Sequence, residues 1–196
     1  MIKSTNSEYG KPMCLLYPGE YYVTGGDIAI ATVSALCLVV CLYDARRMIG
    51  GMGHFILPGV IGTGGIEKSD IAAYGVTQLE YLFGEFVKLG GDRRDVVAKV
   101  FGTASVSSVG KINENILRSN LYFIHEFFTG EKIIVENLDI STTIRRKIVF
   151  FPKSGKCYRK VLKNNVKNSE IIKLENEYID VAFKKKDEKT RVILFD

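Results

Sequence analysis

The feature that most constrains the fold is a run of sixteen mostly apolar residues, from Ile28 to Tyr43, bracketed by two aspartates. A membrane-spanning helix needs about 20 consecutive apolar residues to cross the hydrocarbon core, so this run is short for that purpose. It is rich in Val, Ile and Leu, and Thr32 and Ser34 interrupt it, which is typical of buried strands. We therefore expect a long buried strand here and not a membrane helix.

A second apolar segment, residues 48 to 58, follows this run after a short polar connection. Two apolar segments joined in this way are typical of a hairpin, so residues 36 to 44 and 48 to 58 should pair. The pairing would bring Cys37 close to His54. Cys37 and Cys41 lie four residues apart in the same extended segment, about 13 Å, so a disulfide between them is excluded.

Beyond the hairpin, two segments have helical periodicity and several short ones are typical of strands. The first helix should begin after the N-cap Ser69 and end at Gly90-Gly91, and the second should run from about 113 to 128 and end at Gly130. Strands are predicted at 20–24, 95–106, 132–138, 145–151, 156–163, 177–183 and 191–195. This order predicts an α+β protein, a layered α/β sandwich with a mixed, largely antiparallel sheet and two main helices.

The chain length of 196 residues is sufficient for one good core, so we expect a single domain over residues 1–196. Within it, residues 1–17 should form a loose N-terminus and residues 164–196 a basic C-terminal strand extension. The net charge is +5, and residues 145–196 hold 15 Lys and Arg against 7 Asp and Glu. Because residues 184–189 mix both signs between apolar segments, they are typical of an exposed turn, and nucleic-acid binding is not predicted.

The cysteines, histidines and glycines limit the possible chemistry. With two histidines and no Cys-x-x-Cys pair, the sequence does not predict a structural zinc site, which needs four ligands. The glycines of residues 50–53 and 62–65 match neither a Walker nor a dinucleotide-binding fingerprint, so we assign them turn and close-packing roles. Four irregularly placed cysteines behind a polar start without a signal-peptide core indicate reduced thiols in the cytoplasm.

Thiol chemistry remains, and it requires an imidazole that accepts the proton of the cysteine. His54 is the candidate, whereas His125 lies in the second predicted helix beside Glu126, which is typical of a solvated surface. The residues alone leave Cys37 and Cys41 as equal candidates, and either could be only a small buried hydrophobe. His54 could likewise be a hydrogen-bonded structural histidine.

A longer pattern distinguishes these candidates. Residues 37–44 (CLVVCLYD) followed by 50–58 (GGMGHFILP) resemble the signature of the CheD family of chemoreceptor glutamine deamidases, GSCVAVCLYD followed by GGMNHFMLP, with the same Cys-to-His spacing of 17. The resemblance spans roughly residues 18 to 163. Its further matches, in family order, are Pro18-Gly19-Glu20, Tyr74-Gly75, residues 98–105 (AKVFGTAS), Val109-Gly110, Asn113 and Arg145-Arg146.

This resemblance implies a cytoplasmic chemotaxis enzyme, a protein-glutamine glutaminase that converts receptor glutamines to glutamate without a cofactor. Cys37 would be the nucleophile and His54 its base, with backbone N–H groups near Cys37 binding the oxyanion. The implied partners are methyl-accepting chemoreceptors and a CheC-type phosphatase, without membrane insertion. Two alternatives remain open: a binding module with weakened catalysis that docks receptors or the phosphatase, and an unrelated Cys/His hydrolase such as a toxin-like deamidase.

The chain departs from the family pattern around the implied site. The family's catalytic threonine, six residues before the cysteine, falls on Ala31, and the neighbouring Thr32 is the candidate third residue. Adjacent strand residues face opposite sides, so Thr32 can take this place only with a bulge or a register shift, and otherwise the carbonyl of residue 31 could orient the imidazole. The family's Gly-Ser before the cysteine is Ala35-Leu36 here, and its Asn before the histidine is Gly53, which should remove a polar side chain beside the base.

Overall fold

A computed structural model describes residues 2–4, 9–34, 37–55, 70–102, 112–140, 145–162, 173–175 and 177. The strands fall into two five-stranded sheets with the orders β1-β2-β4-β9-β10 and β3-β6-β5-β7-β8. The first sheet contains β1 (Ile2–Ser4), β2 (Met13–Leu15), β4 (Ala29–Ser34), β9 (Arg146–Phe151) and β10 (Lys156–Val161). The second contains β3 (Tyr21–Thr24), β5 (Leu38–Asp44), β6 (Ile49–Phe55), β7 (Val96–Gly102) and β8 (Ile134–Ile140).

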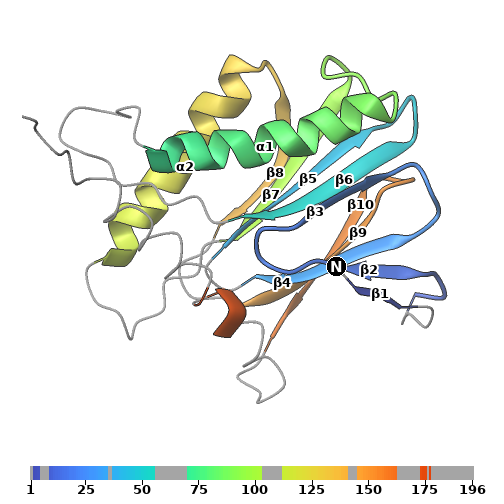
Figure 1. Ribbon diagram of the computed structural model, residues 1–196, viewed down its shortest axis with the longest axis horizontal. Coiled ribbons are helices and arrows are strands. Elements are labelled where there is room, and N and C mark those ends of the chain that lie inside the picture. Colours follow the sequence, from blue (N-terminus) through green and yellow to red (C-terminus); the bar gives the residue numbers. More distant parts are fainter. Residues whose placement is uncertain are drawn as a thin grey trace, which may run out of the picture.

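The two sheets and two helices form three layers. Helices α1 (Asp70–Lys88) and α2 (Ile112–Gly130) cover one face of the β3-β6-β5-β7-β8 sheet, and the other sheet packs on its opposite face (Figure 1). Strand pairs are antiparallel except β2 with β4 and β7 with β8, which are parallel. The predicted α+β class and layered sandwich are confirmed, and the structure adds that the strands are divided between two mixed sheets.

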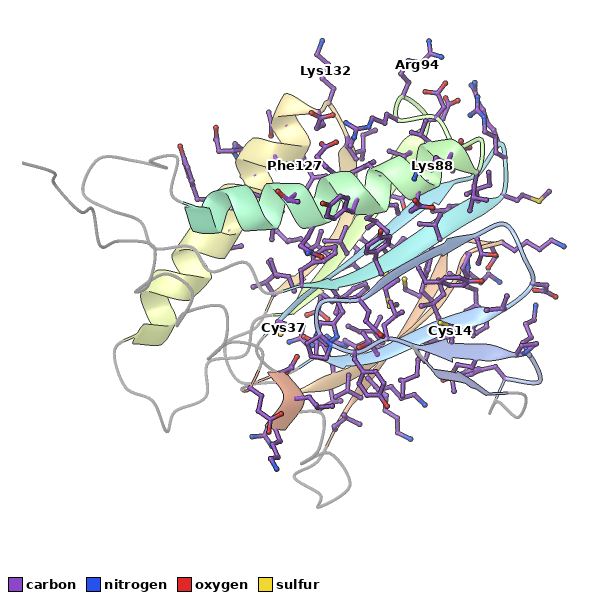
Figure 2. The ribbon with its side chains drawn as sticks, viewed as in Figure 1. Cys14, Cys37, Lys88, Arg94, Phe127 and Lys132 are labelled. Carbon is purple, nitrogen blue, oxygen red and sulfur yellow. The ribbon has the colours of Figure 1, made fainter. Side chains whose placement is uncertain are left out.

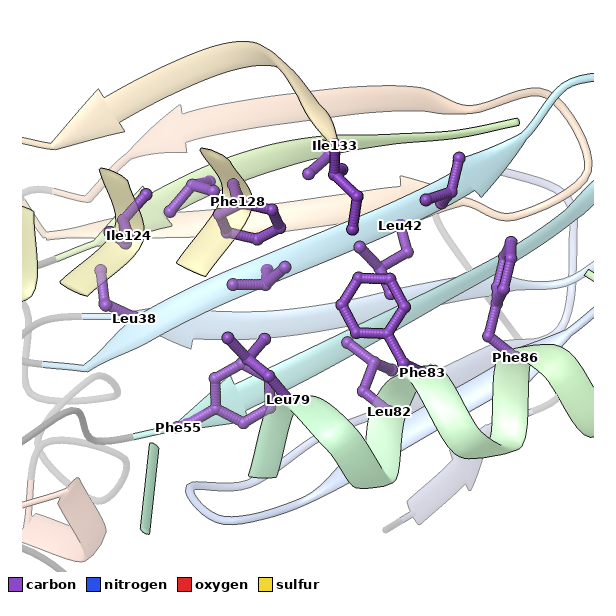
Figure 3. Packing of buried hydrophobic residues seen from close by; sticks show 14 of the residues in the cluster. Leu38, Leu42, Phe55, Leu79, Leu82, Phe83, Phe86, Ile124, Phe128 and Ile133 are labelled. Carbon is purple, nitrogen blue, oxygen red and sulfur yellow. The ribbon is translucent and has the colours of Figure 1, made fainter. Parts of the chain in front are cut away.

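The larger core lies between the helices and the central sheet. Apolar side chains at helical spacing on α1 pack against the side chains of β5 and β6 that point toward the helices (Figure 3). Its fully buried members include Leu38, Leu42, Phe55, Leu79, Leu82, Phe83 and Phe86. This layer packs on one face of the β5–β6 hairpin, and the opposite face of the hairpin packs against the other sheet.

The long apolar run proves to be two strands and not one, so the expectation of a single long strand is wrong. Residues 29–34 form β4 in one sheet, and residues 38–44 form β5 in the other, so the chain crosses between the layers near Cys37. The sequence has no Gly or Pro between the two strands that would mark where the chain crosses. Both strands are buried on both faces, so their apolar composition is the same and gives no sign of the crossing.

The side chains of β4 alternate between two apolar environments. Ala29 and Ala31 lie in a small cluster on the outer face of their sheet with Val149, whereas Ile30 packs between the two sheets. By the same alternation Thr32 lies on the inner face with Ile30. The inner cluster also receives Cys14, Leu16, Val39, Cys41, Met52, Phe101, Ile148 and Phe150.

Where residues are described, the hairpin, both helices and the strands up to residue 162 agree with the predictions to within a few residues. Ser69 and residues 56–58 and 103–106 of the predicted strands lie outside the described residues. The expectation of a loose start over residues 1–17 is wrong for residues 2–4 and 13–15. These form β1 and β2, because the buried Cys14 and Leu16 tie the segment to the inner cluster. In the predicted C-terminal strand extension, residues 173–175 and 177 are helical, and residues 178–183 and 191–195 lie outside the described part.

Among the described residues, no helix is both long enough and apolar enough to cross a membrane.

Candidate active site

The three residues singled out in the sequence meet where the two sheets face each other. Thr32 lies on β4 and His54 on β6, and each points into the space between the sheets. Cys37 precedes β5, at the end of the sandwich where the chain crosses from one sheet to the other (Figure 2). All three are almost completely buried. The predicted hairpin therefore does bring Cys37 and His54 together.

Two hydrogen bonds of Thr32 decide which nitrogen of His54 carries a proton. The Thr32 Oγ1 is 2.9 Å from the carbonyl oxygen of Leu16 and 2.8 Å from His54 Nδ1. A carbonyl oxygen can only accept, so the single hydroxyl proton of Thr32 is donated to Leu16, and the hydroxyl oxygen accepts from Nδ1–H. We therefore place a proton on Nδ1 of His54, which leaves Nε2 as the nitrogen that can act as a base.

The carbonyl oxygen of residue 31 does not orient the imidazole in the structure. The Ala31 carbonyl oxygen accepts the N–H of Leu16 at 2.9 Å, and the Ala31 side chain lies on the outer face of the sheet. Thr32 supplies the contact to Nδ1 from a position five residues before Cys37. The residue that contacts the imidazole is therefore one position nearer to Cys37 than the family pattern places it, and Ala31 faces the opposite side of the strand, as the alternation of strand side chains requires.

The backbone of His54 is held by the turn before β3. The N–H of Gly19 donates to the His54 carbonyl oxygen at 2.7 Å, and the His54 N–H donates to the Glu20 carbonyl oxygen at 2.9 Å. Gly19 has a φ of 84°, a conformation that favours glycine. The Pro18-Gly19-Glu20 match thus has a physical role, because it fixes the strand that carries the imidazole.

Cys37 is positioned by two residues that the sequence reasoning did not identify as part of the site. The Ser34 hydroxyl donates to the Cys37 carbonyl oxygen at 2.6 Å, which ties the last residue of β4 to the residue before β5. Gly102, with a φ of 138°, packs so closely that a Cβ atom there would lie 2.2 Å from the same carbonyl oxygen. Only glycine accommodates this approach. An isolated glycine inside a strand segment, such as Gly102 in the predicted strand 95–106, is a sequence signal for a close backbone approach of this kind.

A third unpredicted residue, Glu175, enters the site from the C-terminal part of the chain. Its carboxylate Oε1 lies 3.0 Å from His54 Nε2, and its side chain has no exposed surface. One oxygen of Glu175, one ring nitrogen of His54 and the Cys37 sulfur all lie within 4.8 Å of one another. Burial raises the pKa of the Cys37 thiol well above its ordinary value, and the charge and hydrogen bond of Glu175 raise it further. No sequence motif marks Glu175.

These three donors are the group among the described residues that could hold a metal ion. A tetrahedral structural zinc site takes four protein ligands, and this set offers one fewer. The direct 3.0 Å contact between His54 Nε2 and the carboxylate already satisfies both groups as a hydrogen bond. The contact therefore joins the imidazole and the carboxyl group as an acid–base pair beside the Cys37 sulfur.

Gly53 does not remove a polar group from beside the imidazole, so that expectation is wrong. Neighbouring strand residues face opposite sides, and position 53 faces the helix layer, where an added Cβ would lie 2.1 Å from the Phe55 ring. The side chain at this position therefore affects packing in the helix-side core.

The other candidates lie elsewhere. Cys41 pairs with Met52 in the sheet, and its pKa is raised by burial and by its hydrogen bond with Cys157. His125 is exposed on α2 beside Glu126, as predicted. The structure thus distinguishes two cysteines that the residues alone leave equivalent, because only Cys37 lies beside the imidazole.

A buried thiol beside an imidazole whose other nitrogen is held by a hydroxyl is the arrangement of cysteine-dependent hydrolases. The family model described as CheD chemotactic sensory transduction matches residues 56–161. The chain belongs to the CheD family.

Proteins with similar sequences match most of the length of this chain. A protein of Dechloromonas aromatica is 36% identical over 87% of this chain and 83% of its own length, and one of Methylobacillus flagellatus is 36% identical over 90% and 84%. A relative from Shewanella oneidensis is 37% identical over 83% of this chain and 78% of its own. All three are described as probable chemoreceptor glutamine deamidases. A solved Neisseria meningitidis structure, described with the DUF152 family, is 13% identical over 69% of this chain and 65% of its own, with a TM-score of 0.43.

Proposed function

We propose that this chain is a protein-glutamine glutaminase that hydrolyses glutamine side chains of methyl-accepting chemoreceptors to glutamate. The observation that carries the proposal is the array of Thr32, His54 and Cys37, in a chain whose relatives are described as chemoreceptor deamidases. Because the substrate side chains belong to the cytoplasmic part of the receptor, the proposal places the protein in the cytoplasm. A CheC-type phosphatase as a further partner is part of the same proposal.

The proposed reaction proceeds through a thioester. His54 Nε2 takes the Cys37 proton, and the thiolate attacks the amide carbon to give a tetrahedral oxyanion. Backbone N–H groups near Cys37 bind the oxyanion, and the imidazolium then donates its proton to the departing ammonia. His54 next takes a proton from water, which attacks the thioester, and the release of the Cys37 sulfur leaves a glutamate. Thr32 keeps Nδ1–H in place throughout, so Nε2 remains the reacting nitrogen.

Incubation of the full chain with the cytoplasmic fragment of a methyl-accepting chemoreceptor should release ammonia and increase the mass of specific receptor peptides by about one dalton per site, because –NH₂ is replaced by –OH. Peptide mass spectrometry together with an ammonia assay measures both. A chain that binds the fragment but leaves every glutamine intact would instead support the alternative of a binding module.

The Thr32→Val variant should lose about 10²-fold in kcat, because valine keeps the shape but cannot accept the Nδ1 proton, so neither the tautomer nor the ring orientation is held. Thr32→Ser retains the hydroxyl and should stay within about tenfold of wild type. Single-turnover deamidation with both variants measures this. The thermal midpoints of the variants serve as the control for folding, since loss of the buried hydroxyl costs about 1 kcal/mol of stability. Equal rates for the valine variant and wild type would exclude the orienting role.

A further inference from the structure

Among the described residues of its helical turn, 173–175 and 177, Glu175 is the one whose side chain is buried. Its side chain is 0% exposed, whereas the preceding Leu174 is 39% exposed and Lys173 also faces solvent. Glutamate is almost never fully buried without a partner, because desolvation of the carboxylate is costly. The turn lies next to the end of the sandwich where Cys37 is labelled (Figure 2). Among the described residues of this segment, Glu175 is the one whose side chain enters the site.

The Glu175 carboxyl group lies where the proposed reaction needs its substrate. An amide carbon must lie within reach of both the Cys37 sulfur and His54 Nε2. A carboxylate oxygen of Glu175 lies within 4.8 Å of the sulfur, and Oε1 lies 3.0 Å from Nε2. Glutamate has the same carbon skeleton as glutamine and is the product of its deamidation. Glu175 therefore corresponds chemically to a product side chain in the site, presented on a turn of helix.

The proton on His54 shows why this contact blocks catalysis. Nδ1 keeps its proton because of Thr32, and the 3.0 Å contact between Nε2 and Glu175 Oε1 is a hydrogen bond, so one further proton lies between these two atoms. If that proton is on the ring, His54 is an imidazolium, and if it is on the carboxyl group, Nε2 accepts a hydrogen bond from it. In both cases the lone pair of Nε2 is occupied, and His54 cannot take the proton of Cys37.

We propose that residues 173–175 are an internal, product-like competitor for the substrate site, with Glu175 in the place of the receptor side chain. This inference rests on the function proposed above and deepens it in two respects. The chain carries its own inhibitor near its C-terminal end, and the site accepts a Glu or Gln side chain that is presented by a helical turn. A receptor must displace this segment before it is deamidated.

The test compares wild type with Glu175→Ala and with the matched control Glu177→Ala, each in the full chain. Glu177 lies two residues further on and is exposed, and it contacts Lys173 at 3.8 Å. Glu175→Ala should increase kcat/KM on the receptor cytoplasmic fragment about tenfold, and Glu177→Ala should leave it unchanged. If Glu175 were a catalytic residue or an essential metal ligand, Glu175→Ala would instead lower the rate, and the proposal would be wrong.

A second variant makes the segment its own substrate. In Glu175→Gln, the new side chain places an amide beside Cys37, so residue 175 should return to glutamate with a gain of about one dalton at a rate independent of protein concentration. The double variant with Cys37→Ala should keep its amide. An amide at position 175 that stays intact, in a Glu175→Gln chain active on receptor fragments, would overturn the substrate-like placement.

A readout that does not depend on deamidation separates the two proposals. Removal of the Glu175 charge should lower the pKa of Cys37, so a larger thiolate fraction is present at a given pH. Alkylation of Cys37 by iodoacetamide, followed by peptide mass spectrometry, should be about tenfold faster in Glu175→Ala, with its pH profile shifted to lower pH. Cys157 serves as the internal reference. Faster alkylation without deamidation by any variant would retain the competitor and reject the deamidase, and unchanged alkylation would reject the competitor.

Discussion

The Cys37→Ala variant is expected to lose deamidation of receptor fragments by at least about 10³-fold, the largest effect of any single substitution on activity. The sulfur is the only atom of this residue that can form the thioester, and neither His54 nor Thr32 can replace it as a nucleophile. Ammonia release and the mass change of receptor peptides, measured under single-turnover conditions, report the loss. Circular dichroism and the unfolding midpoint establish that the variant folds.

Cys41→Ala is the matched control, because Cys41 is as deeply buried as Cys37 but lies beside Cys157 and not beside His54. It should cost about 1 kcal/mol of stability through the small cavity and leave the rate within about twofold of wild type. Activity that survives Cys37→Ala, or is lost only with Cys41→Ala, would rule out the proposed nucleophile.

Gly102→Ala should produce the largest loss of stability, more than about 3 kcal/mol, because two costs coincide. The φ of 138° is unfavourable for alanine, and its Cβ would lie 2.2 Å from the Cys37 carbonyl oxygen and 2.9 Å from the Leu38 Cα. Both contacts are with backbone, so no side-chain rotation relieves them. Urea unfolding at equal m-values measures the change. Activity should fall as well, since the displaced backbone is that of Cys37.

Gly84→Ala is the control for this substitution. Gly84 lies within α1, and an added Cβ there would meet no atom within 4 Å. Alanine is the better helix former, so this variant should gain about 0.5–1 kcal/mol. Equal unfolding midpoints for the two alanine variants would contradict the close approach of β7 to the backbone of Cys37 and Leu38.

The pairing of Cys37 with His54 was predictable because it depends on local pattern. The hairpin of β5 and β6 follows from two neighbouring apolar segments, and the spacing of 17 between cysteine and histidine is a property of the sequence. The helices likewise follow from periodic apolar residues, and the family resemblance named the implied nucleophile and base. Each of these inferences uses residues that are close in the chain.

Local pattern could not predict which residue holds His54 Nδ1. Whether Thr32 or its neighbour reaches the imidazole depends on which face of β4 is turned toward the second sheet, and that face is chosen by packing. A shift of one residue reverses every side chain of a strand, so a resemblance that places Ala31 at this position gives no guide. The sequence also could not show that the run 28–43 is divided between two sheets, because buried strands in either sheet require the same kinds of apolar residue.

For this protein, the sequence by itself determined the class of chemistry, the family, the two helices and the hairpin that supports Cys37 and His54. The tertiary structure alone decided the crossing between sheets, the inward face of Thr32, the close approach of Gly102 to Cys37 and the position of Glu175 in the site. The physical reason is distance along the chain. Propensity and periodicity report on residues a few positions apart, whereas His54 and Glu175 are 121 residues apart and meet only through packing of the whole domain.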